Sequence, residues 1–119
     1  MMKGKTLANF IAKIIEEKKG EDVDIIDVKK FTTLTDYFVI ATSNLAEHGE
    51  AIAYEISKRL KESGNEVFAI DKGSTADWIA LDCGSVIVNI MTKEKRDLYN
   101  LESLFRNLDL INKKIKANS

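Results

Sequence analysis

Apolar residues in the first part of the chain recur at the spacing of one helix face. Between residues 5 and 19 they stand at i, i+3, i+4, i+7 and i+8, at Leu7, Phe10, Ile11, Ile14 and Ile15. This spacing is typical of an amphipathic helix, and the Lys-Lys-Gly run at 18–20 is a suitable end for it. Residues 46–63 repeat the pattern, with one apolar stripe at Ile52, Ile56 and Leu60. We therefore predict two amphipathic helices.

Short runs of β-branched and aromatic residues predict five strands. They cover residues 23–28, 35–42, 66–71, 77–82 and 85–91. The second run is apolar through its centre, which is typical of a strand that is buried on both faces. Cys83 and Gly84 separate the last two runs and predict a tight hairpin there.

The chain returns to helical spacing from Lys93 onward. We expect one further helix there, with an inner apolar stripe formed by Leu98, Leu101, Leu104, Phe105 and Leu108. The predicted order of elements is then α-β-β-α-β-β-β-α. Helices and strands interleave and hairpin links outnumber crossovers, which favours an α/β fold of the α+β kind, a mixed five-stranded sheet flanked by helices.

Nothing in the sequence marks an internal domain boundary, since it contains no proline and no linker rich in glycine or serine. A length of 119 residues suits one domain. We expect a single domain over residues 1–119, in which residues 107–119 form an extended or frayed helical tail.

Positive and negative charges are nearly balanced, with 18 Lys and Arg against 19 Asp and Glu and a net charge of −1. Proteins that bind nucleic acid through bulk electrostatics carry a clear basic excess, so this class is disfavoured. The charge is unevenly distributed, because residues 21–106 hold ten basic and sixteen acidic side chains between two mildly basic ends. Such an acidic body favours a basic protein partner, or metal ions where carboxylates converge.

Cysteine content and hydropathy indicate the compartment. Cys83 is the only cysteine, so the chain has no internal disulfide and none of the Cys and His spacings of a zinc site. The N-terminus lacks the apolar stretch of a signal peptide, and no uncharged apolar run approaches the ~20 residues that span a bilayer. We therefore expect a cytoplasmic protein without a membrane segment.

Side chains suited to catalysis are scarce. The only histidine, His48, lies on the first turn of the second predicted helix beside Glu47 and Glu50. It is either a general base or metal ligand there, or a solvated surface residue. No serine or cysteine has a recognisable base partner, so we predict no nucleophile.

The predicted order of elements is similar to that of nucleotidyltransferases, which place a Gly-Ser turn ahead of paired carboxylates that hold two Mg²⁺ ions. Here Gly73-Ser74 is followed by the single acid Asp77, and Gly84-Ser85 by an apolar strand. The chain contains no D-x-D motif. We therefore predict no catalytic residue, no metal site and no cofactor.

Trp78 is the first candidate for recognition of a partner. Strand alternation places Trp78, Ala80 and Asp82 on one face. An aromatic side chain that shares a strand face with an acid is a plausible contact patch, since Trp is enriched at interface hot spots. In the alternative interpretation Trp78 packs under a helix and Asp82 caps the hairpin. Spacing alone leaves both interpretations open.

Two further groups have the same ambiguity. Asp36 and Tyr37 form either a turn at the start of the second strand or a polar rim beside the patch. Arg96, Tyr99 and Glu102 recur every three residues, as an exposed polar stripe or as a local ladder that solubilises the last helix.

Four runs in register carry a resemblance to a known family. They are Leu34-Thr35-Asp36-Tyr37-Phe38-Val39-Ile40-Ala41-Thr42, then Ala76-Asp77-Trp78-Ile79-Ala80-Leu81-Asp82-Cys83-Gly84, then Val86-Ile87-Val88, and finally residues 96–105. Together they resemble the ribosomal silencing factor (Iojap) family, from about Leu7 to Phe105.

The resemblance implies a factor that is not an enzyme, with a degenerate nucleotidyltransferase fold. It implies binding to the large ribosomal subunit through the universally shared protein number fourteen, which would block joining of the small subunit and lower translation when nutrients are scarce. Organellar members assist large-subunit assembly. The resemblance implies no cofactor, no small-molecule substrate, a possible homodimer when free, and at most a minor rRNA contact.

The resemblance also implies a set of residues that bind the partner: Asp36, Tyr37, Trp78, Asp82, Asn89, Met91, Arg96, Tyr99 and Glu102. This chain departs from the family pattern in several places. Asn89 stands where the family usually has a histidine, so an amide must take over whatever that imidazole does. Ser85 replaces an acid, and Phe105 replaces the closing Trp. A metal-dependent transferase and a homodimeric adaptor remain the alternative functions.

Overall fold

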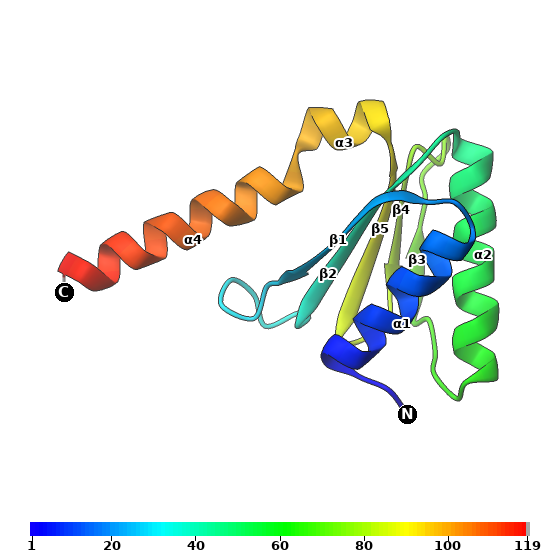
Figure 1. Ribbon diagram of the computed structural model, residues 1–119, viewed down its shortest axis with the longest axis horizontal. Coiled ribbons are helices and arrows are strands. Elements are labelled where there is room, and N and C mark those ends of the chain that lie inside the picture. The colour runs from blue at the N-terminus through cyan, green and yellow to red at the C-terminus, as the bar shows by residue number, and fades with distance from the viewer. Residues whose placement is uncertain (119) are drawn as a thin grey trace.

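Five strands form one mixed sheet in the computed structural model, which describes residues 1–118 (Figure 1). They are β1 (Glu21–Asp27), β2 (Tyr37–Ser43), β3 (Ala69–Asp71), β4 (Trp78–Asp82) and β5 (Val86–Thr92), in the spatial order β1-β2-β5-β4-β3. The central pair, β2 and β5, is parallel, and every other neighbouring pair is antiparallel. The predicted mixed five-stranded sheet is confirmed.

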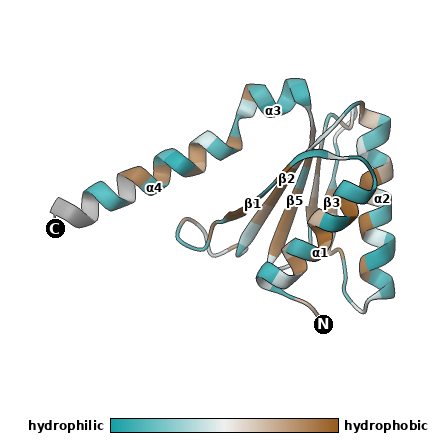
Figure 2. Cartoon of the chain, in the orientation of Figure 1, coloured by the Kyte–Doolittle hydropathy of each residue, from teal (hydrophilic) through white to brown (hydrophobic). Residues whose placement is uncertain are grey.

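Two helices cover one face of this sheet. Helix α1 (Gly4–Glu17) packs on β1 and β2, and α2 (Ala46–Glu62) packs on β4 and β5. Both helices turn their predicted stripes inward, so that Ile11 and Ile56 are fully buried against Val39 and Ile90. Figure 2 shows the corresponding apolar colour on the inner sides of α1 and α2. Burial of this apolar surface is the main favourable contribution to folding.

The third predicted strand is shorter than the pattern indicated. Of residues 66–71 only 69–71 pair with β4, and Phe68 donates one further backbone hydrogen bond to the carbonyl of Asp82. The strand begins three residues later than predicted, and before it the Phe68 ring lies over Gly84 in the β4–β5 hairpin, where an added Cβ would lie 3.2 Å from it. The prediction of a strand over the whole run is wrong.

The last helix is divided into two, which corrects the prediction of one continuous helix from Lys93. Helix α3 (Lys93–Tyr99) ends at Asn100, and α4 (Leu101–Asn118) starts in a new direction. Asn100 has φ 47° and ψ 58°, a left-handed conformation that asparagine tolerates better than most residues. Figure 1 shows α4 extending away from the sheet. The predicted inner stripe is therefore wrong in part, because Leu98 and Leu104 are 68% and 50% exposed, whereas Leu101, Phe105 and Leu108 are half-buried.

Most of the expected C-terminal tail is helical. Residues 107–118 continue α4, and Ser119 lies outside the described residues. Across residues 1–118, no helix combines the length and apolar composition that crossing a membrane requires.

Ile56 and Tyr54 on α2 provide a test of this packing. Replacing Ile56 with Ala removes fully buried methyl groups and should lower the free energy of unfolding by about 2–5 kcal/mol in a urea titration. Tyr54 lies two residues away and is 71% exposed, so Tyr54→Ala should change stability by no more than about 0.5 kcal/mol. Equal losses in the two variants would contradict the assignment of the buried face.

Candidate partner-binding surface

The sheet face opposite α1 and α2 is covered by α3 and the start of α4, and we call it the α3 face. Alternation along the three inner strands assigns nine residues to it. They are Phe38, Ile40 and Thr42 of β2, Ile87, Asn89 and Met91 of β5, and Trp78, Ala80 and Asp82 of β4. The prediction that Trp78, Ala80 and Asp82 share one face is therefore correct.

Trp78 forms an aromatic pair with Tyr99 of α3. Their ring centroids are 4.8 Å apart and the rings are tilted by 49°. Trp78 is half-buried and Tyr99 is 52% exposed, so the pair lies at the protein surface. A hollow of about 380 Å³ opens beside it, between α3 and the turn that joins β3 to β4. The two sequence interpretations each hold in part, because Trp78 is partly covered by a helix and is still accessible.

Asn89 lies beneath this pair and is only 3% exposed. The indole Nε1 of Trp78 donates a hydrogen bond of 2.9 Å to its Oδ1. Within the part of the chain that the structure describes, the buried Nδ2 group of Asn89 has no hydrogen-bond partner. A buried donor without a partner costs about 1–3 kcal/mol. Met91 lies next to Asn89 on the same face and is fully buried.

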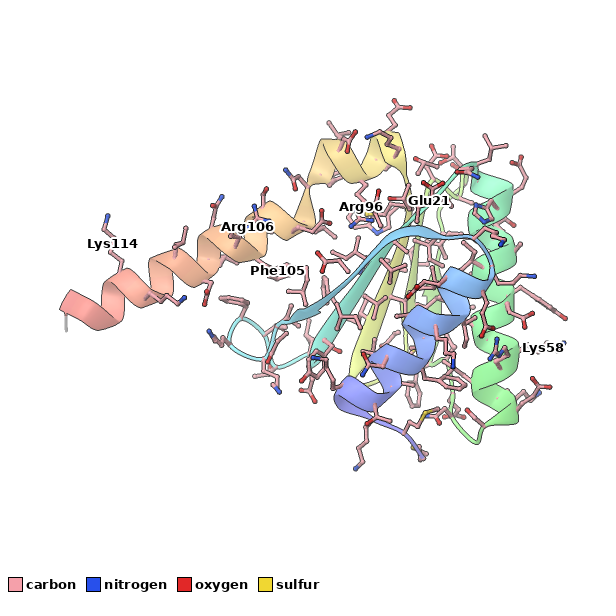
Figure 3. The ribbon with its side chains drawn as sticks, viewed as in Figure 1. Glu21, Lys58, Arg96, Phe105, Arg106 and Lys114 are labelled. Atoms are coloured by element: carbon pink, nitrogen blue, oxygen red, sulfur yellow. The ribbon has the colours of Figure 1, made fainter. Side chains whose placement is uncertain are left out.

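Arg96 holds α3 against the end of the sheet. Its guanidinium donates to the carbonyl of Asp22 and to Oγ1 of Thr42, the latter over 3.0 Å. Its Nε lies 3.4 Å from a carboxylate oxygen of Glu102 at the start of α4. Figure 3 shows Arg96 beside Glu21, at the start of β1, where the guanidinium donates to Asp22. Arg96 and Glu102 thus point inward and Tyr99 outward, so these three residues do not form an exposed stripe.

Asp36 and Tyr37 lie at the opposite end of the sheet from Trp78. In the register, Tyr37 pairs with Val86 and Trp78 with Met91, positions that are roughly 16 Å apart along β5 at ~3.3 Å per residue. The Tyr37 side chain also points to the other face of the sheet, the one covered by α1 and α2. The structure therefore does not bring these two predicted residues together with Trp78.

Tyr37 interacts instead with Lys29 in the loop after β1. The Nζ of Lys29 donates to the Tyr37 hydroxyl over 3.2 Å and lies 4.9 Å from the ring centroid. This hydrogen bond, with the charge of Asp27, raises the pKa of Lys29 above its ordinary value. Asp36 contributes through its backbone, since its N–H donates to the carbonyl of Ser85 over 3.1 Å. A turn at the start of β2 is therefore the better description of both residues.

Asp82 caps the β4–β5 hairpin, as one of the two sequence interpretations held. Its Oδ1 accepts a hydrogen bond of 2.9 Å from the N–H of Gly84. Cys83 in the same turn is 5% exposed, and burial raises the pKa of its thiol to about 12, with a further contribution from the charge of Asp82. The thiol is therefore neutral and poorly reactive at neutral pH.

His48 joins the end of α1 to the start of α2. Its Nδ1 accepts from the N–H of Asn44 over 3.1 Å, so its Nε2 carries the hydrogen that is donated to the carbonyl of Lys18 over 2.8 Å. Both ring nitrogens of His48 are therefore bonded to the backbone, and His48 is neither simply a solvated residue nor a metal ligand. Among residues 1–118, no three His, Cys, Asp or Glu side chains converge in a way that could hold a metal ion.

An aromatic cluster at the base of α4 was not identified from the sequence. The ring of Phe105 lies 5.1 Å from that of Phe38 and 5.8 Å from that of Phe31. Figure 3 shows Phe105 on the side of α4 that faces the sheet. One turn further on, Asp109 accepts from Lys30 over 2.9 Å, and this bond lowers the pKa of Asp109. These contacts attach the first turns of α4 to the loop after β1.

Comparison with known proteins confirms the resemblance drawn from the sequence. The family described as "Ribosomal silencing factor during starvation" matches residues 2–119. A protein of Halalkalibacterium halodurans named "Ribosomal silencing factor RsfS" is 31% identical over 104 residues, which cover 87% of this chain and 89% of that protein.

More distant relatives extend the comparison. A crystal structure of a protein from Chromobacterium violaceum superposes with a TM-score of 0.82 at 27% identity, covering 87% of this chain and 86% of that one. A mouse protein named "Mitochondrial assembly of ribosomal large subunit protein 1" is 27% identical over 82% of this chain, which corresponds to 44% of its own length.

The environment of Cys83 predicts a dependence of stability on pH. Because the folded thiol has a pKa of about 12 against an ordinary 9.0, the folded state disfavours the thiolate. Its stabilising contribution is complete below pH 9 and is lost as the pH rises toward about 12. In urea titrations over this pH range, the free energy of unfolding of the wild type should fall more steeply than that of Cys83→Ala. Rapid labelling of the folded thiol at pH 8 by a disulfide reagent would contradict the buried environment.

Proposed function

Because the chain belongs to the ribosomal silencing factor family, we propose that it binds the large ribosomal subunit and prevents the small subunit from joining it. One observation carries the proposal: the paired rings of Trp78 and Tyr99, which stay accessible on a sheet face that α1 and α2 leave uncovered. Large aromatic residues at the centre of a surface patch are the usual anchors of protein interfaces.

The proposed partner on the subunit is its universally shared protein number fourteen, as the sequence resemblance implies. The charge of the whole body supports a basic protein partner, because residues 21–106 carry an acidic excess. The hollow beside Trp78 is itself balanced in charge, since Asp71 and Asp77 line it together with Lys72 and Lys95. Charges of opposite sign on the two partners speed encounter and fix their orientation more than they add affinity.

The proposed mechanism is steric and requires no chemical turnover and no cofactor. While the chain occupies its site, the small subunit cannot use the same surface, and the two compete by mass action. Translation by the ribosomes of the cytoplasm then falls in proportion to the fraction of large subunits that are occupied. Repression is therefore reversible and depends on the concentration of the factor.

A role in assembly of the large subunit is the second candidate, and the name of the mouse relative favours it. The same surface would serve both functions, since a factor that docks on an immature subunit also excludes the small subunit. The two differ in outcome. An assembly factor leaves immature large subunits when it is lost, whereas a silencing factor leaves more joined ribosomes in starved cells.

We also propose that the free chain pairs with a second copy of itself through α3 and α4. Leu98, Leu104 and Leu110 on these helices are at least half exposed. Leu98 belongs to α3 and the other two to the projecting α4, and a second copy packed against both helices would remove this apolar surface from water.

Trp78 provides the main test of ribosome binding. In co-sedimentation with purified large subunits, Trp78→Ala should weaken binding by about tenfold or more, because it removes a central aromatic anchor. The matched control is Tyr54→Ala, which removes an exposed aromatic side chain of α2 on the other face of the sheet and should bind like the wild type. In sucrose gradients, added wild-type protein should reduce the joined-ribosome peak, and Trp78→Ala should reduce it less.

Binding by Trp78→Ala at wild-type affinity would exclude this patch. Equal losses in the two variants would point to another surface or to a general effect on folding, which a urea titration of each variant separates.

Self-association is tested by light scattering across a range of concentrations. Leu104→Asp should shift the wild-type protein toward the mass of a monomer, because a buried carboxylate destabilises an apolar contact. Leu45→Asp is the control, since Leu45 is 65% exposed at the start of α2 and far from α4 in the chain. A wild-type mass of 13.4 kDa at all concentrations would rule out the homodimer.

A further inference from the structure

We propose that Asn89, which is too deeply buried to touch a partner itself, is a positioning residue that holds the Trp78 indole in its binding orientation. The proposal rests on the function proposed above. It assigns a role to a residue of β5 that lies directly beneath the aromatic pair, with its Oδ1 bonded to the indole nitrogen over 2.9 Å.

The surroundings of Asn89 are apolar, which argues against a role in stability. Its neighbours in the two adjacent strands are Ile40 and Ala80, and the next residues of β5 on the same face are Ile87 and Met91. A carboxamide in such a layer loses its hydration and regains only part of it through hydrogen bonds. An apolar side chain of the same size would fill the space without this cost.

The orientation of the amide follows from the indole. Nε1 of Trp78 is only a donor, so the oxygen of the Asn89 amide must face it, and Nδ2 must point the other way. Turning the amide over would place two donors against each other. Among the described residues, Nδ2 is left without a partner in the only orientation that serves Trp78. The Nδ2 group of Asn89 therefore lacks a hydrogen bond in the orientation in which Oδ1 fixes the indole.

A fixed indole matters because Trp78 has few other restraints. Its ring contacts Tyr99, and both rings border a hollow between α3 and the β3–β4 turn. Without the bond to Asn89 the indole is free to rotate toward this hollow. Binding would then have to order the side chain, and that loss of rotamer freedom weakens affinity.

The decisive variant is Asn89→Leu, studied in the full chain. It removes the donor that lacks a partner, so the urea midpoint should stay the same or rise. Trp78 is the only tryptophan, so its fluorescence reports the indole directly, and its anisotropy should fall as the ring gains freedom. Binding to purified large ribosomal subunits should weaken by about tenfold, although the protein is at least as stable.

Asn89→His is the rescue variant. A neutral imidazole offers one acceptor and one donor, as the amide does, whereas the charged form has two donors. The variant should bind nearly as well as the wild type at pH 8 and lose affinity and anisotropy only at a pH below the ordinary imidazole range, because the apolar layer disfavours the charged form, while the wild type changes less. The charged groups around this face are common to both proteins, so the wild-type profile accounts for them: Asp24, Asp71, Lys72, Asp77, Asp82, Lys95, Arg96 and Glu102.

Three results would overturn the proposal. The first is an unchanged anisotropy in Asn89→Leu, the second is wild-type binding by that variant, and the third is a loss of stability large enough to explain its weaker binding. If the wild type itself does not co-sediment with large subunits, the proposed function fails. The anisotropy of Asn89→Leu still decides whether Asn89 positions Trp78, because that measurement needs no partner.

Discussion

The guanidinium of Arg96 joins three elements that are far apart in the chain. It binds a carbonyl at the start of β1 and a hydroxyl near the end of β2, and it pairs with Glu102 at the start of α4. Helix α3 has no buried residue of its own, so these polar contacts and the pairing of Tyr99 with Trp78 attach it to the sheet. The accessible aromatic pair therefore depends on a charged side chain that is only 12% exposed.

The two faces of the sheet differ in what stabilises them. Under α1 and α2 the interior is made of aliphatic side chains, and it supplies most of the apolar burial. The α3 face contains a buried asparagine and a buried threonine among its apolar residues, and its cover is short. A sheet stabilised on one side can carry polar groups and accessible rings on the other, because the apolar burial under α1 and α2 offsets the stability lost there.

Local periodicity predicted the helices and strands, since apolar spacing depends on neighbouring residues alone. It also placed Trp78 and Asp82 on one face. The break at Asn100 could not be predicted in this way, because the helices on either side of it are tied to distant parts of the chain, with Arg96 of α3 bonded to residues 54 and 74 positions earlier. The grouping of Tyr37 with Trp78 failed for a related reason. The parallel pairing of β2 with β5 decides which ends of β2 and β4 lie together. The sequence of a single strand does not show which strand it pairs with or in which direction.

The turn at Asn100 lengthens the molecule. Because α4 departs from the sheet instead of folding back on it, the longest dimension is 47 Å, about twice the shortest at 23 Å. Phe105 and Asp109 attach the first turns of the arm to the body. A molecule of this shape excludes others from an area well beyond its own point of attachment. Under the proposed function, the area closed to other molecules is therefore wider than the docked surface.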